Sequence, residues 1–125
     1  MFSKILELAK KENYQWQQLI DYIFITTGAI SAFCAFEDEQ LVGYAIFTCD
    51  ENNDILFLEE LFVATNKRHM GIGSQLFELC ESVADENNAK FQLLVKDSNA
   101  LRYYLKRNMK VIGKRYDHFL LEKTT

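Results

Sequence analysis

The stretch from Ile55 to Val95, ILFLEELFVATNKRHMGIGSQLFELCESVADENNAKFQLLV, decides the fold of this chain. It opens with an apolar run that predicts a β-strand over 55–64. Apolar positions then recur every three or four residues, which predicts an amphipathic helix from Gly71 to Glu86. The almost wholly apolar run over 90–95 predicts a second strand, of the kind found inside a sheet beside a parallel neighbour. Together these segments predict a βαβ unit.

The segments on either side of this unit extend the predicted sheet. Apolar and aromatic runs over 30–36 and 41–49 predict strands, and the polar loops between them are short enough to imply an antiparallel meander. Residues 98–108 predict a second helix, and 110–123 predict one or two final strands with a bend at Gly113. The expected fold class is therefore α/β with a mixed, mostly antiparallel sheet.

The N-terminal region has a helical pattern from Ser3 to about Thr27. Four apolar residues recur with the spacing of one helix face, namely Trp16, Leu19, Ile20 and Ile23. A bend near Glu12 would divide this region into two helices, and Gly28 is placed to cap its C-terminal end.

Length and composition limit the class of protein. A chain of 125 residues with 49% apolar residues fits one compact globular domain. The net charge of −4 argues against a general nucleic-acid binder and slightly favours small cationic partners. No apolar run approaches the length of a signal peptide or a membrane span.

The cysteines point to a reducing environment. Cys34, Cys49 and Cys80 have neither CxxC spacing nor paired histidines, so they predict reduced thiols in a cytoplasmic protein instead of disulfides or a zinc site. Because all three lie in apolar segments, the predicted role of each is core packing.

Two adjacent carboxylates, Glu59 and Glu60, interrupt the apolar strand over 55–64. Burying a carboxylate is costly unless it is paired, neutralised or hydrated. Successive strand residues point to opposite faces, so both side chains share one face only if a β-bulge intervenes. Either the middle of the strand borders a wet cleft, or the two residues are edge carboxylates paired with lysines.

The loop RHMGIG, Arg68 to Gly73, joins this strand to the helix. Gly71 and Gly73 leave the backbone bare where the helix begins, and the first helical turn has unpaired N–H groups and partial positive charge. Such a turn suits a pyrophosphate, and Lys67 adds positive charge beside it. The alternative is a helix start shaped only by tight packing against the strand. The P-loop motif GxxxxGK[ST] and the dinucleotide motif GxGxxG are both absent.

The segment LEELFVATNKRHMGIGSQLFEL resembles motif A of the GNAT family of N-acetyltransferases. The family signature, Arg/Gln-x-x-Gly-x-Gly/Ala, is matched by Arg68, Gly71 and Gly73. Downstream, SNALRYYLKRNMKVIG is similar to a second family segment, whose positions fall on Ala100, Tyr104, Lys106 and Gly113. The resemblance covers about residues 40 to 120, and its motif A looks locally similar to the spermidine/spermine (diamine) acetyltransferase branch.

Several positions depart from the family pattern. Asn108 stands where the family usually has glycine, although asparagine tolerates the same left-handed conformation. Met109 replaces a phenylalanine, and Asp97 falls where asparagine is common, with Asn99 two residues later. The strand that opens the family fold has no counterpart before the N-terminal helical region. The resemblance therefore implies a GNAT-like sheet with helices on both faces and without its first strand. The N-terminal half of the acceptor site would then be either reduced or completed by a second subunit in a homodimer.

The resemblance implies an acetyl-CoA-dependent N-acetyltransferase that moves an acetyl group to a primary amine of a small molecule or peptide in a ternary complex. It makes Glu59 the general base and Tyr104 the general acid, and Glu60 either a contact of a cationic acceptor or a side chain on the opposite, solvated face. In the family the pantetheine arm of the cofactor pairs with a bulged strand, here at Leu61, Phe62 and Val63, and a backbone N–H near Phe62 stabilises the oxyanion. The other implied cofactor contacts are Arg68, His69, Met70, Gly71, Ile72, Gly73, Ser74 and Asn99.

The implied organisation is a single GNAT-like domain over 1–125: a helical N-terminal region (1–28), the strands and cofactor-binding βαβ unit (30–96), and a helix with C-terminal strands (97–125). No metal, nucleic acid or membrane is expected to take part. Two other functions fit the sequence: a non-catalytic acyl-CoA-binding sensor or interaction module, and an α/β interaction domain without a cofactor.

Overall fold

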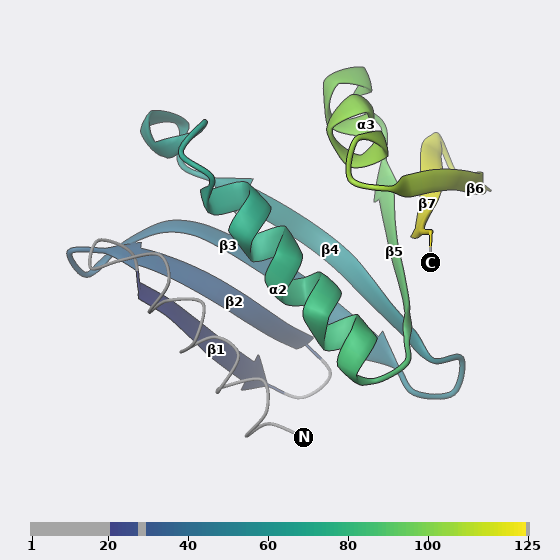
Figure 1. The fold of residues 1–125 in the computed structure, drawn as a ribbon, viewed down its shortest axis with the longest axis horizontal. Coiled ribbons are helices and arrows are strands. Elements are labelled where there is room, and N and C mark those ends of the chain that lie inside the picture. The colour runs from purple at the N-terminus through teal and green to yellow at the C-terminus, as the bar shows by residue number, and fades with distance from the viewer. Residues whose placement is uncertain (1–20, 28–29, 125) are drawn as a thin grey trace.

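A computed structural model of the chain describes residues 21–27 and 30–124. They form one seven-stranded sheet in the order β1-β2-β3-β4-β5-β7-β6 (Figure 1). The strands are β1 (Asp21–Thr27), β2 (Ile30–Glu37), β3 (Gln40–Asp50), β4 (Ile55–Val63), β5 (Lys90–Val95), β6 (Met109–Arg115) and β7 (His118–Lys123). β4 and β5 are parallel and the other neighbours are antiparallel, so the predicted mixed sheet is confirmed.

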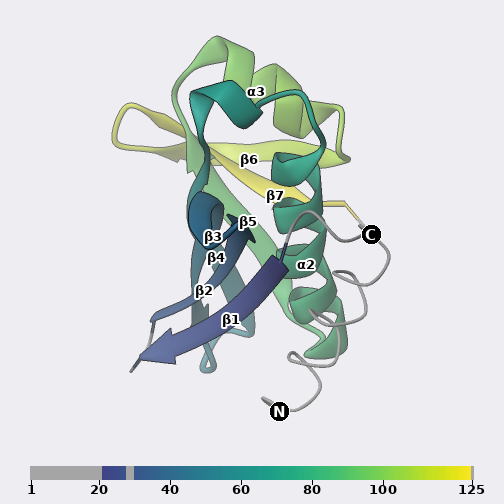
Figure 2. The same cartoon turned by 90° about the vertical axis from the view of Figure 1, so that its left-hand side faces the viewer.

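Helix α2 (Ile72–Glu86) lies across one face of the sheet (Figures 1 and 2). Its predicted apolar stripe is buried, and Leu76 and Cys80 are fully covered against core residues such as Phe33 and Phe47. This burial is what holds the helix on the sheet. A short 3₁₀ helix, η1 (Thr65–Lys67), precedes it.

The C-terminal part begins with α3 (Ser98–Leu105), which contacts α2 through Phe77 and Tyr104, with ring centroids 5.8 Å apart. α3 is shorter than the predicted helix over 98–108, because Asn108 adopts a left-handed φ of 64°. The register of β6 against β7 shifts between Val111 and Gly113, at the predicted bend. Neither described helix is long and apolar enough to cross a membrane.

The expected N-terminal helix is wrong for residues 21–27, which form the edge strand β1. Tyr22 is buried whereas Ile23 and Ile25 are 47% and 49% exposed, the alternation of a strand. A short run rich in β-branched residues fits both periodicities, and pairing with β2 decides for the strand. The rest of the predicted helical region, up to residue 20, and its cap Gly28 lie outside the described residues.

The cysteine prediction is correct for one thiol and wrong for another. Cys80 is buried and Cys34 is half-buried, but Cys49 is exposed. Cys49 lies one residue from the end of β3, beside the turn into β4. The last two residues of this strand are exposed, although the sequence up to Cys49 is apolar. All three thiols are free, as predicted.

Candidate functional site

β4 and β5 diverge part-way along their length. They pair only from Ile55–Lys90 to Leu58–Leu93, so the rest of β4, residues 59–63, runs beside β3 but has no partner in β5. Figure 1 shows the two strands separating from their common end toward α3. We call this divergence the fork. It leaves backbone N–H and C=O groups of β4 unpaired along one edge, which is the arrangement that an extended ligand can fill.

A β-bulge lies at the start of the fork. Ile46 pairs with Glu60 and Phe47 pairs with Leu58, so Glu59 is the extra residue of β4. The predicted condition for the two glutamates to share a face is therefore met.

Both carboxylates lie on the sheet face opposite α2. A Cβ built on Gly43 would meet Ile72 and Leu76 of α2, so odd-numbered β3 positions face the helix here and Tyr44, Ile46 and Thr48 face away. Glu59 Oε1 accepts a hydrogen bond of 3.2 Å from the Thr48 hydroxyl, and Glu60 lies against Tyr44.

The partners of the two glutamates are hydroxyl groups. A hydrogen bond to Glu60, with smaller contributions from desolvation and from the negative charge, raises the pKa of the Tyr44 hydroxyl. Within the described part of the chain neither glutamate forms an ion pair, and both side chains are exposed. The alternative of lysine-paired edge carboxylates is therefore not observed there. The register of β3 against β4 brings Thr48 beside Glu59 and Tyr44 beside Glu60. The sequence alone does not reveal this register.

The turn that opens α2 is shaped as a backbone cradle. His69 and Gly71 both have left-handed φ values, 66° and 86°, and Gly71 is the N-cap. No side chain caps the helix and its first turn has no acidic residue. Turns of mixed handedness gather N–H groups into concavities that accept anions. The described chain thus leaves the start of α2 unsatisfied by its own side chains.

Packing among the described residues does not require glycine at position 73. A Cβ there would make only ordinary contacts, 3.4 Å from Val63 Cγ2 and 3.7 Å from the Tyr103 hydroxyl. A bare backbone at this position would allow a ligand to approach closely.

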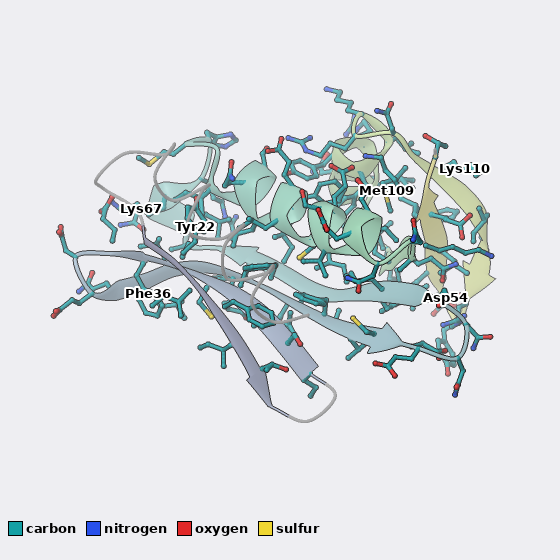
Figure 3. All side chains as sticks on the ribbon, turned by 60° about the horizontal axis from the view of Figure 1, so that its bottom comes forward. Tyr22, Phe36, Asp54, Lys67, Met109 and Lys110 are labelled. Atoms are coloured by element: carbon teal, nitrogen blue, oxygen red, sulfur yellow. The ribbon has the colours of Figure 1, made fainter. Side chains whose placement is uncertain are left out.

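The two cations of this loop have partners of their own. Lys67 forms an ion pair with Glu37, and Arg68 Nε donates to the Val63 carbonyl at 3.1 Å. In Figure 3, Lys67 lies near the end of the molecule where α2 begins, and Asp54 lies at the other end. His69 and Met70 are exposed beside Arg68. Of the apolar positions assigned to the cofactor, Ile72 is buried, Leu61 and Val63 are half-buried and Phe62 is 39% exposed.

Tyr104 lies on the other side of the sheet from Glu59. Its ring packs against Phe77 of α2 and edge-on against Tyr103. Burial, aided by the neighbouring Tyr103, raises the pKa of Tyr104 to about 12. The phenol therefore keeps its proton throughout the neutral range.

Ser74, a predicted cofactor contact, lies in a cluster that joins α3 and the residue Arg107 after it to the first turn of α2. Arg107 Nη2 donates to Ser74 Oγ at 2.5 Å, and its guanidinium lies 3.6 Å from the centre of the Tyr103 ring. The Tyr103 hydroxyl lies 3.3 Å from the same Ser74 oxygen. The cluster ties the second helix to the open turn.

Asp97 and Asn99 have local roles. Asp97 Oδ2 accepts from the Ala100 N–H at 2.9 Å and so caps α3. Asn99 Oδ1 accepts from Arg102 at 2.6 Å, on the exposed surface of the helix. Across residues 21–27 and 30–124 no group of three or more metal-ligating side chains is found.

The family model described as the acetyltransferase (GNAT) family matches residues 2–109. The chain belongs to the GNAT family. No curated protein matches its sequence.

Solved structures share the GNAT fold with this chain. PaiA N-acetyltransferase from Thermoplasma acidophilum, solved with coenzyme A, has a TM-score of 0.69 and 24% identity over 78% of this chain and 62% of its own. Nourseothricin acetyltransferase has a TM-score of 0.68 and 22% identity over 77% of this chain and 65% of its own. A GNAT acetyltransferase from Elizabethkingia anophelis with acetyl-CoA bound has a TM-score of 0.72 and 12% identity over 87% of this chain and all of its own. The chain thus spans less than two thirds of the first two.

Proposed function

We propose that the protein transfers an acetyl group from acetyl-CoA to a primary amine at the fork. The observation that carries the proposal is the bulge of β4, which places Glu59 at the start of an unpaired strand edge whose other end reaches the uncapped start of α2. Membership of the GNAT family and relatives solved with coenzyme A or acetyl-CoA support the choice of donor.

The donor would be held by backbone groups. The N–H groups of residues 71–74 would bind the diphosphate, and Leu61 to Val63 would pair with the pantetheine amides along the fork. Arg68 would exchange the Val63 carbonyl for a phosphate, which frees that carbonyl for the donor. Arg107 and Tyr103 hold Ser74 and thereby keep the first turn of α2 in place.

The chemistry requires a base and an acid on opposite sides of the thioester. Because an alkylammonium has a pKa of roughly 10, Glu59 must take a proton before the amine attacks. The neutral amine adds to the thioester carbonyl and forms the C–N bond, and a backbone N–H near Phe62 stabilises the oxyanion. Collapse of this intermediate breaks the C–S bond, and Tyr104 gives its proton to the departing thiolate and takes one from the positively charged nitrogen. A pKa of about 12 keeps Tyr104 in the donor form at neutral pH.

Calorimetry with coenzyme A tests the binding half of the proposal. We expect wild-type protein to bind, and Gly73→Ala to weaken binding at least about tenfold without lowering the melting temperature, since alanine favours the helix. Gly113→Ala, where a Cβ meets nothing within 4 Å, is the matched control. Wild-type affinity weaker than about 1 mM would instead favour an interaction domain without a cofactor.

The catalytic half is tested with Glu59→Gln. Glutamine keeps an oxygen for the Thr48 hydroxyl but cannot take a proton, so kcat should fall by roughly 10²–10⁴ while coenzyme A still binds. Glu60→Gln is the neighbouring control, with an expected effect mainly on the KM of a cationic amine. An unchanged kcat in Glu59→Gln would remove Glu59 from the reaction.

A non-catalytic acyl-CoA-binding module is the second candidate. Two features favour it: Arg68 is bonded to the Val63 carbonyl, and Asp97 caps α3 at the position where the family commonly has asparagine. It predicts tight coenzyme A binding with no thiol release from acetyl-CoA in the presence of any amine. Among acceptors, the local similarity of motif A to the diamine branch makes a diamine one candidate.

A further inference from the structure

The sheet face that carries Glu59 and Glu60 is largely apolar on the side of these carboxylates that leads toward β1. Beside Glu60, the rings of Tyr44 and Phe62 stack with centroids 5.2 Å apart at an interplanar angle of 27°. Phe62 is 39% exposed, so one side of this ring pair is open. Ile46 is half-buried and pairs with Glu60 across the two strands. Ring pair and carboxylates thus occupy neighbouring positions on β3 and β4.

The apolar surface continues away from the fork. Cys34 and Ala32 of β2 pair with Tyr44 and Ile46, and behind them lie Ile23 and Ile25 of β1, both about half exposed. An open apolar surface that is continuous with a reaction site typically receives the apolar part of a ligand.

We propose that the acceptor is a primary amine carried on an apolar, aromatic body, with Phe62 and Tyr44 as the residues that select it. The inference rests on the proposed function and names its substrate class. The carboxylates complement the ammonium form of the amine, and the ring faces attract both a neighbouring cation and an aryl group. A short diamine would satisfy the carboxylates but leave the ring pair exposed to water.

Tyr44 has two separable contributions. Its ring is half of the Tyr44–Phe62 ring pair, whereas its hydroxyl lies beside Glu60. Phe62 contributes only a ring. Selection for the aromatic body should therefore depend on Phe62 and on the Tyr44 ring, and not on the Tyr44 hydroxyl.

The experiment compares kcat/KM for three amines at saturating acetyl-CoA: ethylamine, 2-phenylethylamine and 1,4-butanediamine. We expect 2-phenylethylamine to exceed each of the others by about tenfold or more. Phe62→Ala should reduce that ratio to below about threefold, and Phe62→Leu, which keeps an apolar side chain in the strand, should give an intermediate ratio. Tyr44→Phe should keep the wild-type ratio. Val111→Ala, at a 45% exposed position of β6, is the control and should also keep it.

The outcomes separate this inference from the proposed function. Acetylation of all three amines with equal kcat/KM, or a preference for the diamine, overturns the inference and leaves the acetyltransferase intact. No acetylation of any amine, with coenzyme A still bound, overturns the proposed function instead. The inference also fails if Phe62→Ala and Phe62→Leu keep the ratio but change the melting temperature or the oligomeric state. That result would mean that another part of the chain, or a second copy, covers the Tyr44–Phe62 ring pair.

Discussion

At the level of single residues, Gly43 is the position where the β3 backbone comes closest to its neighbours. A Cβ there would lie 2.9 Å from the Phe62 carbonyl oxygen and 3.2 Å from both Ile72 and Leu76. Gly43→Ala should therefore lower the free energy of unfolding by about 1–3 kcal/mol, because strand and helix must move apart. Urea denaturation measures the change. Gly113→Ala makes no such contacts and should cost less than about 0.5 kcal/mol. Equal losses of unfolding free energy in both variants would show that the contacts around Gly43 do not make alanine unfavourable there.

Tyr104 links burial to pH. Its pKa is raised from 10.0 to about 12 in the folded protein, chiefly by desolvation. The unfolded chain therefore loses this proton first as the pH rises, so the contribution is complete below pH 10 and is lost between pH 10 and 12. At pH 11 the loss should amount to about 1.4 kcal/mol relative to pH 8.

Chemical denaturation of wild-type protein and Tyr104→Phe at pH 8 and pH 11 isolates this loss. The variant should lose about 1.4 kcal/mol less than wild type over that interval. Tyr116→Phe, at a side chain that is 89% exposed, is the control and should follow wild type. Parallel behaviour of wild type and Tyr104→Phe would mean that the phenol is hydrated in solution.

At the level of elements, α3 depends on its N-cap. Asp97 accepts the Ala100 N–H, and Leu101 N–H donates to the Asp97 carbonyl. Asp97→Ala should destabilise the protein by about 1 kcal/mol, and Asp97→Asn should recover most of it because asparagine also caps. Asp117→Ala, at an exposed position in the turn between β6 and β7 with an ordinary φ, is the matched control. If Asp97→Ala lost coenzyme A affinity without losing stability, position 97 would be a cofactor contact instead of a cap.

The elements show where sequence patterns suffice and where they do not. The spacing and number of apolar residues predicted β2 to β5 and α2 to within two residues at each end. They failed at 21–27, where a run of seven residues fits helix and strand alike and contact with β2 makes the choice. The spacing of Gly71 and Gly73 predicted the open turn before α2. This turn could be predicted because it is formed by residues that are neighbours in the sequence.

The candidate site was harder to predict, because its geometry comes from register. Nothing in the chain order shows that Thr48 reaches Glu59, 11 residues later, or that Arg107 reaches Ser74, 33 residues earlier. The bulge that brings Glu59 to Thr48 was expected only from the family resemblance. Tyr44 and Phe62 are 18 residues apart in the sequence, and only the strand pairing puts their rings together.

At the level of the whole molecule, two parts of the sheet meet over a short seam. β1 to β4 and β5 to β7 share only four residue pairs, Ile55–Lys90 to Leu58–Leu93, and α2 covers the junction (Figure 1). A cofactor bound in the fork, as proposed, would join the two parts along the rest of β4.

Hydrogen exchange with and without coenzyme A tests this arrangement. Amides of 59–63 that point into the fork have no partner in β5, so they should exchange quickly in the free protein and at least about tenfold more slowly at saturating coenzyme A. Amides of β2, which are paired on both sides, should change only with global stability. Gly73→Ala should remove the protection at coenzyme A concentrations that saturate wild type. Protection limited to the first turn of α2, with none over 59–63, would place the pantetheine arm outside the fork and separate diphosphate binding from the delivery of the thioester to Glu59.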